Sequence, residues 1–333
     1  MATRKKSASP PQPHKGNPHL DHVYACGKRL PACKRQCDRN ANATHDRRPN
    51  WRFDGRAMRA IGIVTTLMLA AAAPADADPR ALHALYSASV ERLRDSPFGR
   101  PLWIASTEAD GRLEGEIRAV VQHSFIRVEA LTDPAHWCEL LTLLPNIRQC
   151  RAAADDRQLT LWFARRFDEP PADTHPVRFD MRTRALRGAH LEVVLEAPKG
   201  PLGTSDYRVE LGAVPVDKER VFLHVRYGYA YGLSARIAAG AYLATGGRDK
   251  VGFTVVASPA AAPEYIGGLR GAVERNAMRL YLVIEAYLHA LDGSVAQRRD
   301  RSLRIWLDAI ARYPRQLAEA DPSAYLEAKR ERL

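Results

Sequence analysis

The stretch Glu264–Leu291 reads EYIGGLRGAVERNAMRLYLVIEAYLHAL. It predicts one long helix, because its apolar residues recur at the three- and four-residue spacing of a helical stripe. Between Leu280 and Leu288 apolar residues stand on nearly every side of this helix, which indicates that most of its faces are covered. Upstream, Val221–Tyr231 alternates in character from residue to residue and predicts a strand with one apolar face. A buried helix facing a sheet is therefore the expected core of the fold.

The rest of the chain after residue 77 predicts further strands and helices, separated by Pro, Gly and Asp clusters. The other strands are expected at Leu113–His123, Leu159–Phe167, Val177–Met181, His190–Glu196, Tyr207–Val214 and Lys250–Ala257. The other helices are expected after the Asp78-Pro79 cap, at Phe125–Leu131, Ala135–Leu141, Leu233–Thr245 and Arg301–Tyr313, and after Asp321-Pro322. This order predicts an α+β fold whose antiparallel sheet wraps the long helix, with extra helices near both ends.

A short phrase, Leu131-Thr132-Asp133-Pro134-Ala135-His136-Trp137, follows the first expected strand. It is similar to the L-x-D-P-x-x-W phrase of the START-like superfamily (polyketide-cyclase-like, SRPBCC proteins). Together with the order of elements, the resemblance covers roughly Gly115 to Leu291 and implies the helix-grip fold. The chain also resembles a group of exported proteobacterial proteins in that superfamily, through phrases such as Gly200–Thr204 and Asp249–Phe253. No function follows from this second resemblance.

A secretory signal is predicted at Met58–Ala77. A short basic start, an apolar core of about 13 residues and the exit Ala75-Asp76-Ala77 are typical of a signal with an A-x-A cleavage site. The core is shorter than the ~20 apolar residues that a spanning helix needs. We therefore expect a periplasmic or secreted protein that begins at Asp78. Anchoring in the inner membrane through residues 59–77 is the alternative.

The residues before Met58 form a basic leader. Residues 1–59 hold 14 Lys and Arg against 4 Asp and Glu, whereas residues 78–333 hold 36 against 33. The formal net charge of +12 therefore belongs mainly to the leader, and it predicts no nucleic-acid-binding domain. Few aliphatic residues and many Pro and Asn residues indicate a disordered extension, unless the start codon is placed too early. The spacing of Cys26, Cys33 and Cys37 lacks the paired knuckles of a structural zinc site.

Five segments follow from these observations. They are a leader at 1–57, the signal at 58–77, a helix and linker at 78–112, the START-like domain at 113–291 and a helical extension at 292–333. Cys138 and Cys150 are the only cysteines after the signal. In an oxidising compartment such a pair predicts a disulfide, and two buried thiols are the alternative.

The sequence carries no motif of a common catalytic site. It has no H-E-x-x-H, no P-loop, no G-x-G-x-x-G and no G-x-S-x-G elbow. The histidines after the signal do not pair at ligand spacing on one helix, so we predict no metal, no cofactor and no catalytic residue. Glu285 lies among apolar residues of the long helix, where it would either pair with His289 or act as an acid–base in an enzyme.

Candidate ligand-binding residues are polar groups expected near the interior of the grip. Arginine can hold a carboxylate or phosphate with two parallel hydrogen bonds, and tyrosine offers an apolar ring with a polar tip. The candidates are Arg208, Arg226, Tyr227, Tyr229, Tyr231, Arg275, Asn276 and Arg279. Structural pairing of Arg275 or Arg279 with Glu274, and tyrosines that serve only as core residues, remain open alternatives.

The expected function is binding of an apolar or amphipathic, lipid-like small molecule between sheet and helix. Such a site predicts a cavity of at least ~300 Å³. A cyclase- or hydrolase-like enzyme that uses the same cavity is one alternative. A structural or interaction protein with a filled core is another. Peripheral contact with a membrane would fit the first function.

Overall fold

The computed structural model describes residues 78–155, 157–245, 247–256, 263–318 and 321–330. The leader, the Met58–Ala77 signal and Cys26, Cys33 and Cys37 lie outside the described residues, so the expectations for them stay predictions. In the described part of the chain, none of the helices combines the length and the hydrophobicity that crossing a bilayer requires.

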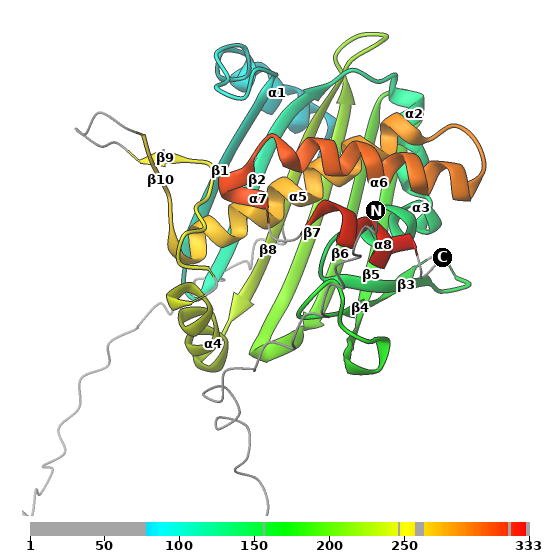
Figure 1. The fold of residues 1–333 in the computed structure, drawn as a ribbon. Coiled ribbons are helices and arrows are strands. Elements are labelled where there is room, and N and C mark those ends of the chain that lie inside the picture. Colours follow the sequence, from blue (N-terminus) through cyan, green and yellow to red (C-terminus); the bar gives the residue numbers. More distant parts are fainter. Residues whose placement is uncertain (1–77, 156, 246, 257–262, 319–320, 331–333) are drawn as a thin grey trace, which may run out of the picture. The chain divides into compact units, whose positions relative to one another are not determined.

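One antiparallel sheet of eight strands forms the centre of the domain (Figure 1). Its spatial order is β1-β2-β8-β7-β6-β5-β4-β3. The strands are β1 (Leu102–Ala109), β2 (Arg112–Val121), β3 (Ile147–Ala152), β4 (Gln158–Phe163), β5 (His175–Leu186), β6 (His190–Lys199), β7 (Thr204–Pro215) and β8 (Val221–Tyr231). A separate hairpin pairs β9 (Val255–Val256) with β10 (Glu264–Tyr265).

Helices cover both faces of this sheet. They are α1 (Pro79–Arg94), α2 (Phe125–Glu129), α3 (Pro134–Leu141), α4 (Leu233–Ala244), α5 (Gly268–Ala290), α6 (Val295–Ala311), α7 (Pro314–Leu317) and α8 (Pro322–Arg330), with 3-10 turns at Ala130–Thr132, Pro171–Asp173 and Pro201–Gly203. In Figure 1, α5 crosses the inner face of the sheet and α6 runs in front of α5. On the outer face α1 packs against β1, β2 and β7.

The strand β8 shows why the two faces of the sheet differ. Because successive side chains alternate, Leu223, Val225 and Tyr227 join the inner core beneath α5. Phe222 points to the other face, where it packs against Tyr86 of α1. The helix α5 can approach the inner face closely because β2 carries Gly115 at the crossing. A Cβ atom at Gly115 would lie 2.9 Å from the Cβ of Ala277.

The fold class predicted from the sequence is confirmed: an antiparallel sheet packs on a long helix, with extra helices at both ends of the described chain. Two strands of the eight-stranded sheet were not predicted. Leu102–Ala109 lies in the segment expected to be a helix and linker, yet it pairs with β2 through a turn at Asp110 and Gly111, both with positive φ. An Asp-Gly pair is a typical signal for such a hairpin turn. The strand β3 follows α3 in a segment where the sequence pattern predicts no helix or strand.

The start of the long helix was also predicted too early. Glu264–Tyr265 forms β10, and the helix begins at Gly268. In the expected strand Lys250–Ala257, only Val255–Val256 pairs as a strand among the described residues. The chain before this strand is held instead by the buried carboxylate of Glu274. That carboxylate accepts hydrogen bonds from the Phe253 backbone N–H at 2.6 Å and from the Thr254 backbone N–H at 2.9 Å.

The predicted disulfide is confirmed. Cys138 in α3 and Cys150 in β3 are joined, and their Cα atoms lie 5.1 Å apart. This distance is ordinary for a disulfide. The bond ties the middle of α3 to the edge strand β3 and closes the segment between them.

Removing this disulfide should lower the stability of the domain. Replacing both Cys138 and Cys150 by Ala should lower the free energy of unfolding by about 3 kcal/mol, because the unfolded chain then loses a loop constraint. Urea denaturation under non-reducing conditions measures the loss. As a control, a reductant should destabilise the native protein but not the double variant. Equal stability of the two proteins without reductant would contradict the prediction.

Candidate functional site

Three tyrosines gather on the inner face of the sheet, beside the first half of α5. Tyr207 of β7 stacks on Tyr229 of β8 with ring centroids 5.3 Å apart, and Tyr227 lies 5.9 Å from Tyr229. Burial raises the pKa of Tyr229 to about 12 and holds the pKa of Tyr227 well above its ordinary value. Their hydroxyls therefore stay neutral at physiological pH and can both donate and accept hydrogen bonds.

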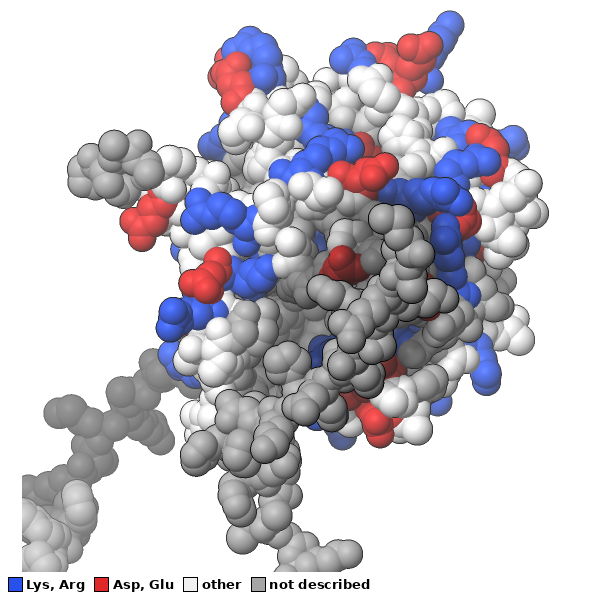
Figure 2. Space-filling model, in the orientation of Figure 1, with Lys and Arg blue, Asp and Glu red and all other residues white. Residues whose placement is uncertain are grey.

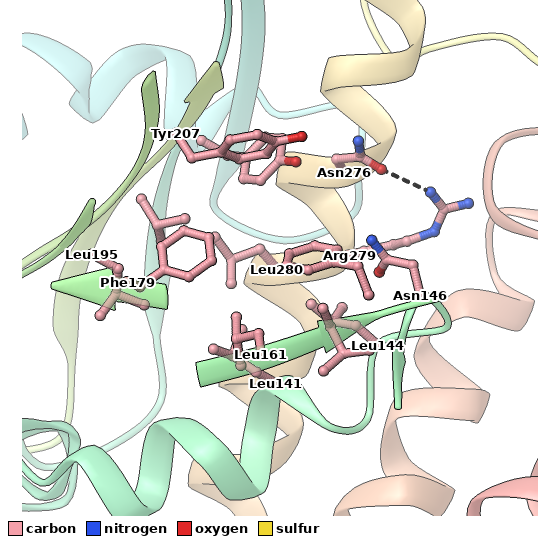
Figure 3. A pocket seen from close by; sticks show the side chains of 14 residues that line it. Leu141, Leu144, Asn146, Leu161, Phe179, Leu195, Tyr207, Asn276, Arg279 and Leu280 are labelled. Atoms are coloured by element: carbon pink, nitrogen blue, oxygen red, sulfur yellow. Dashed lines mark hydrogen bonds between the residues drawn. The ribbon is translucent and has the colours of Figure 1, made fainter. Parts of the chain in front are cut away.

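The helix α5 places Asn276 and Arg279 near Tyr207 and Tyr227 (Figure 3). The Arg279 guanidinium donates to the side-chain oxygen of Asn276 at 3.2 Å. The positive charge of Arg279 and a hydrogen bond with Asn276 work against the rise in the pKa of Tyr227, although burial outweighs both. Tyr227, Asn276 and Arg279 thus form one polar group on the boundary between helix and sheet.

This polar group borders an internal cavity whose other walls are mostly apolar (Figure 3). The cavity is lined by Leu141, Leu144, Asn146, Ile147, Leu161, Phe163, Phe179, Leu195, Tyr207, Val209, Tyr227, Asn276, Arg279 and Leu280. Its volume is about 60 Å³, which corrects the expectation of at least ~300 Å³. Leucine and phenylalanine side chains from α3, β4, β5 and β6 fill most of the space between sheet and helix.

Two predicted arginines do not reach this cavity. Arg208 and Arg226 lie on the outer face of the sheet, because strand alternation points them away from Tyr207 and Tyr227. Arg226 pairs with Glu114 and Glu210, at 2.9 Å in each case. Arg208 pairs with Glu196 and with Glu210. They belong to an ion-pair network on the outer face and do not line the cavity.

The remaining candidates divide between the interior and the strand end. Tyr231 ends β8, and its hydroxyl donates to Glu108 at the exposed end of the sheet, so it does not line the cavity. Arg275 is buried but does not line the cavity. Its guanidinium lies 3.5 Å from the Val251 carbonyl oxygen, and its charge acts on Tyr229. Of the predicted residues, the structure brings Tyr227, Asn276 and Arg279 together at the cavity.

Sequence reasoning missed Tyr207, which also lines the cavity. The sequence pattern could have identified it, since Tyr207, Val209 and Leu211 share one face of an alternating strand.

The expectation for Glu285 is corrected too. Glu285 pairs with Arg100 rather than with His289. Its carboxylate is therefore engaged in an ion pair, which weakens the case for an acid–base role. His289 packs instead against His123, with ring centroids 4.4 Å apart.

A larger hollow lies next to the cavity, among α4, α6, α7 and α8. It is a groove of about 750 Å³ with apolar walls and cationic side chains. Its lining residues are Pro145, Asn146, Arg165, Arg166, Phe167, Tyr242, Lys250, Trp306, Leu307, Ile310, Ala311, Pro314, Leu317, Ala318, Pro322 and Tyr325. Asn146 lines both hollows, which places the groove beside the polar end of the cavity.

The two hollows share a charge pattern. Among the described residues that line them there is no Asp or Glu, whereas Arg165, Arg166, Lys250 and Arg279 are basic. Arg166 pairs with Asp168 and Arg165 with Glu169, but these carboxylates do not line the groove. A ligand in this space would therefore meet positive charge and apolar surface together. In the described part of the chain, no three His, Cys, Asp or Glu side chains cluster closely enough to hold a metal ion.

The wall between cavity and groove is the loop that the Cys138–Cys150 disulfide closes. This loop supplies lining residues to the cavity (Leu141, Leu144, Asn146 and Ile147) and to the groove (Pro145 and Asn146). The helix α8 fixes the loop from the other side. The buried side-chain nitrogen of Lys329, whose pKa burial lowers to about 7, donates to carbonyl oxygens in it, and those of Thr142, Leu144 and Ile147 lie at 2.7, 2.6 and 2.8 Å.

The arrangement of the site settles the type of fold. One antiparallel sheet holds a long, nearly fully buried C-terminal helix, and the candidate site lies between them. The fold is a helix grip. This confirms the fold predicted from the element order and from the Leu131–Trp137 phrase. Here the helix grip carries an additional layer, because α6, α7 and α8 continue beyond the gripping helix α5.

Comparison with solved structures finds several similar chains. The chain is similar to a START superfamily protein from Mycobacterium smegmatis, with 12% identity and a TM-score of 0.33 over 54% of this chain and 99% of that one. It is similar to norcoclaurine synthase from Thalictrum flavum, with 15% identity and a TM-score of 0.30 over 43% and 90%. It is also similar to a STAR-related lipid transfer protein from Xanthomonas axonopodis, with 12% identity and a TM-score of 0.29 over 39% and 77%.

These likenesses concern the arrangement of elements and carry nothing about a ligand or a reaction. No protein-family model matches the sequence, and no curated protein matches it. The function of this helix grip therefore has to be argued from its own cavity, groove and charges.

Replacing Lys329 by Met should loosen the wall between cavity and groove. The variant leaves three carbonyl oxygens without their donor, so we expect the free energy of unfolding to fall by roughly 2–4 kcal/mol. Urea denaturation measures the change. The neighbouring Arg330→Met is the matched control, because Arg330 makes an exposed pair with Asp300 that should contribute less than about 1 kcal/mol. Similar losses in both variants would contradict the assigned role of Lys329.

Proposed function

We propose that this domain binds an amphipathic small molecule that carries an anionic group. The observation that carries the proposal is Asn146, which lines both the apolar cavity and the cationic groove. The cavity alone, at about 60 Å³, holds only a small apolar end of a ligand. The groove, at about 750 Å³, has the volume of a small-molecule site. The two together fit a molecule that is apolar at one end and polar in its middle.

The orientation of the ligand follows from where the polar groups lie. In Figure 3, Asn146, Asn276 and Arg279 stand at one side of the cavity, whereas Phe179 and Leu195 stand at the opposite side. The apolar end would occupy the Phe179 side, where burial contributes about 25 cal/mol per Å² of apolar surface. A carboxylate or phosphate would lie at the Asn146 side, and the rest of the ligand would lie along the groove.

Substitutions that separate charge from packing test this proposal. A dansyl-labelled fatty acid, used below its micelle concentration, should bind the full chain and increase its fluorescence. Arg279→Gln should weaken this acid roughly 10- to 100-fold but weaken its neutral methyl ester far less, because only the acid loses a charge-assisted bond of about 1.5–3 kcal/mol. Equal loss for acid and ester would mean that Arg279 acts only through the structure.

A groove-filling variant tests the location of the ligand. Ala311 is exposed in the last turn of α6 and lines the groove, so Ala311→Trp should block binding without disturbing the core. Ala296→Trp is the matched control, since Ala296 is exposed at the other end of α6 and does not line the groove. Fluorescence titration and thermal unfolding of both variants give the comparison. Full binding by the Ala311 variant would exclude the groove.

A second candidate is an interaction protein with a filled core. The small volume of the cavity favours it, because ordinary packing could leave such a space without any ligand. The two candidates differ in one measurement: a filled-core protein would bind neither the labelled acid nor its ester. The enzyme alternative has less support, since Glu285, the acid–base considered for it, is paired with Arg100.

We also propose that the protein is exported and that its working form begins at Asp78. The support is the pattern of Met58–Ala77, a basic start, an apolar core and a small-residue exit. The Cys138–Cys150 disulfide agrees with an oxidising compartment. Mass spectrometry of the protein from its native cell should find Asp78 at the N-terminus. An intact chain in the cytoplasm would contradict export, and an intact chain in the membrane fraction would favour anchoring through residues 59–77.

A further inference from the structure

The helix α4 is apolar and lies largely in solvent. Its sequence, LSARIAAGAYLA, contains Arg236 as its one charged residue, and among its described residues only Ala235 is buried. Leu233 is 75% exposed and Ile237 is 65% exposed. Figure 1 shows α4 at the margin of the domain, below the N-terminal end of α5. A helix with this composition is ordinarily buried. Its exposure in the described structure therefore indicates a surface that another molecule covers.

Exposed apolar side chains concentrate at this place. Leu202, in the 3-10 turn against which α4 packs, is 61% exposed, and Tyr242 in the last turn of α4 is 44% exposed. Elsewhere in the described chain, the exposed large apolar side chains include Ile126, Leu186 and the adjacent pair Val255 and Val256. Single exposed apolar residues are normal on soluble proteins, whereas a continuous set on one helix marks an interaction surface.

We propose that α4 docks this domain onto the surface of an anionic lipid bilayer. Apolar residues stand around most of the circumference of α4, so a protein partner that covers one face would leave the others in water. A lipid interface surrounds a helix that sinks into it and can cover all of these side chains. The length also fits, because a 12-residue helix lies in the interface rather than across the bilayer.

Figure 2 shows basic and acidic side chains interspersed on this face of the domain, and the excess of basic residues in and just after α4 favours a negatively charged lipid surface. Arg236 is on the helix, and Arg248 and Lys250 follow it closely, against Asp249 as the acid in this stretch. Basic groups near an apolar helix strengthen its binding to anionic lipids. A second copy of the chain is a less suitable partner, since pairing α4 with itself would bring the same positive groups together.

The docking surface adjoins the proposed ligand site. Tyr242 belongs to α4 and also lines the groove, as does Lys250 shortly after it. A bilayer that covers α4 would therefore lie near one end of the groove. The inference rests on the proposed function in this respect: the bilayer would be the place where the amphipathic ligand is collected or released.

Hydrogen exchange provides a local test. The full chain is mixed with vesicles of phosphatidylglycerol and phosphatidylcholine, and amide exchange is followed by mass spectrometry. A local measurement is needed because the apolar core of Met58–Ala77 can bind vesicles by itself. Peptides from residues 233–244 should exchange at least tenfold more slowly on anionic vesicles, and less so on pure phosphatidylcholine. Peptides that contain Ile126 or Leu186 should not change.

Matched variants complete the test. Leu233→Ser combined with Ile237→Ser should remove the slowing in α4, whereas Ile126→Ser combined with Leu186→Ser should keep it. All four side chains are exposed, so thermal unfolding should be unchanged. Unchanged exchange of α4 in vesicle-bound protein would overturn the inference. Slowing that requires no vesicles and grows with protein concentration would overturn it in favour of a second copy.

The outcome is independent of the ligand experiment, because the labelled fatty acid is measured without vesicles. Binding of the acid with no protection of α4 would reject the membrane contact and leave the proposed function standing. Protection of α4 with no binding of the acid would support the membrane contact and reject the ligand site.

Discussion

The close packing of α5 on β2 is the constraint on which the rest of the structure depends. It requires Gly115, because a Cβ atom there would lie 2.9 Å from the Ala277 Cβ and 3.0 Å from the Val273 carbonyl oxygen. Contacts this short would force the helix away from the sheet. With glycine in place, α5 lies on β1, β2 and β8, and its opposite side is free to receive α6. The sheet, α5 and α6 therefore stack in that order.

This close approach explains why the interior of the grip is small. Once α5 lies near the sheet, side chains such as Leu161, Phe179 and Leu195 meet it and occupy the volume that a large ligand would need. The small cavity lies at the edge of this packing, where α5 presents the polar side chains of Asn276 and Arg279 instead of apolar ones. The larger hollow is found outside the grip, where α6, α7 and α8 form a second layer that leaves a groove.

The distribution of charge separates the two faces of the sheet. On the outer face, Arg208 and Arg226 are neutralised by glutamates on neighbouring strands. Burial alone would raise the pKa of Glu116 there, but hydrogen bonds from His224 and Arg118 lower it to about 2, so it remains ionised. The described lining of the cavity and groove has the opposite character, with basic residues and no carboxylate. The charge pairs on the outer face are structural, and the basic residues that line the cavity and the groove are the reason for proposing an anionic ligand.

Local sequence determined the elements and the class of the fold. The stripe of Glu264–Leu291, the alternation of Val221–Tyr231 and the Asp-Pro caps each depend on residues close in the chain, so they can be read without a structure. The disulfide was predictable because only two cysteines follow the signal. Even Tyr207 carried a readable signal, since it shares a strand face with Val209 and Leu211.

The site itself depended on pairings that local sequence does not contain. Glu114 and Glu210 meet Arg226 because β2, β8 and β7 lie side by side in one register, and that order is fixed only when the sheet forms. Arg100, far from Glu285 in sequence, reaches it only after β1 joins the sheet beside α5. The volume of the cavity depends on side chains from several elements that meet α5 at once. Helices and strands follow from residue patterns that repeat every two to four positions. Contacts between distant segments decide which charges are paired and which spaces stay open.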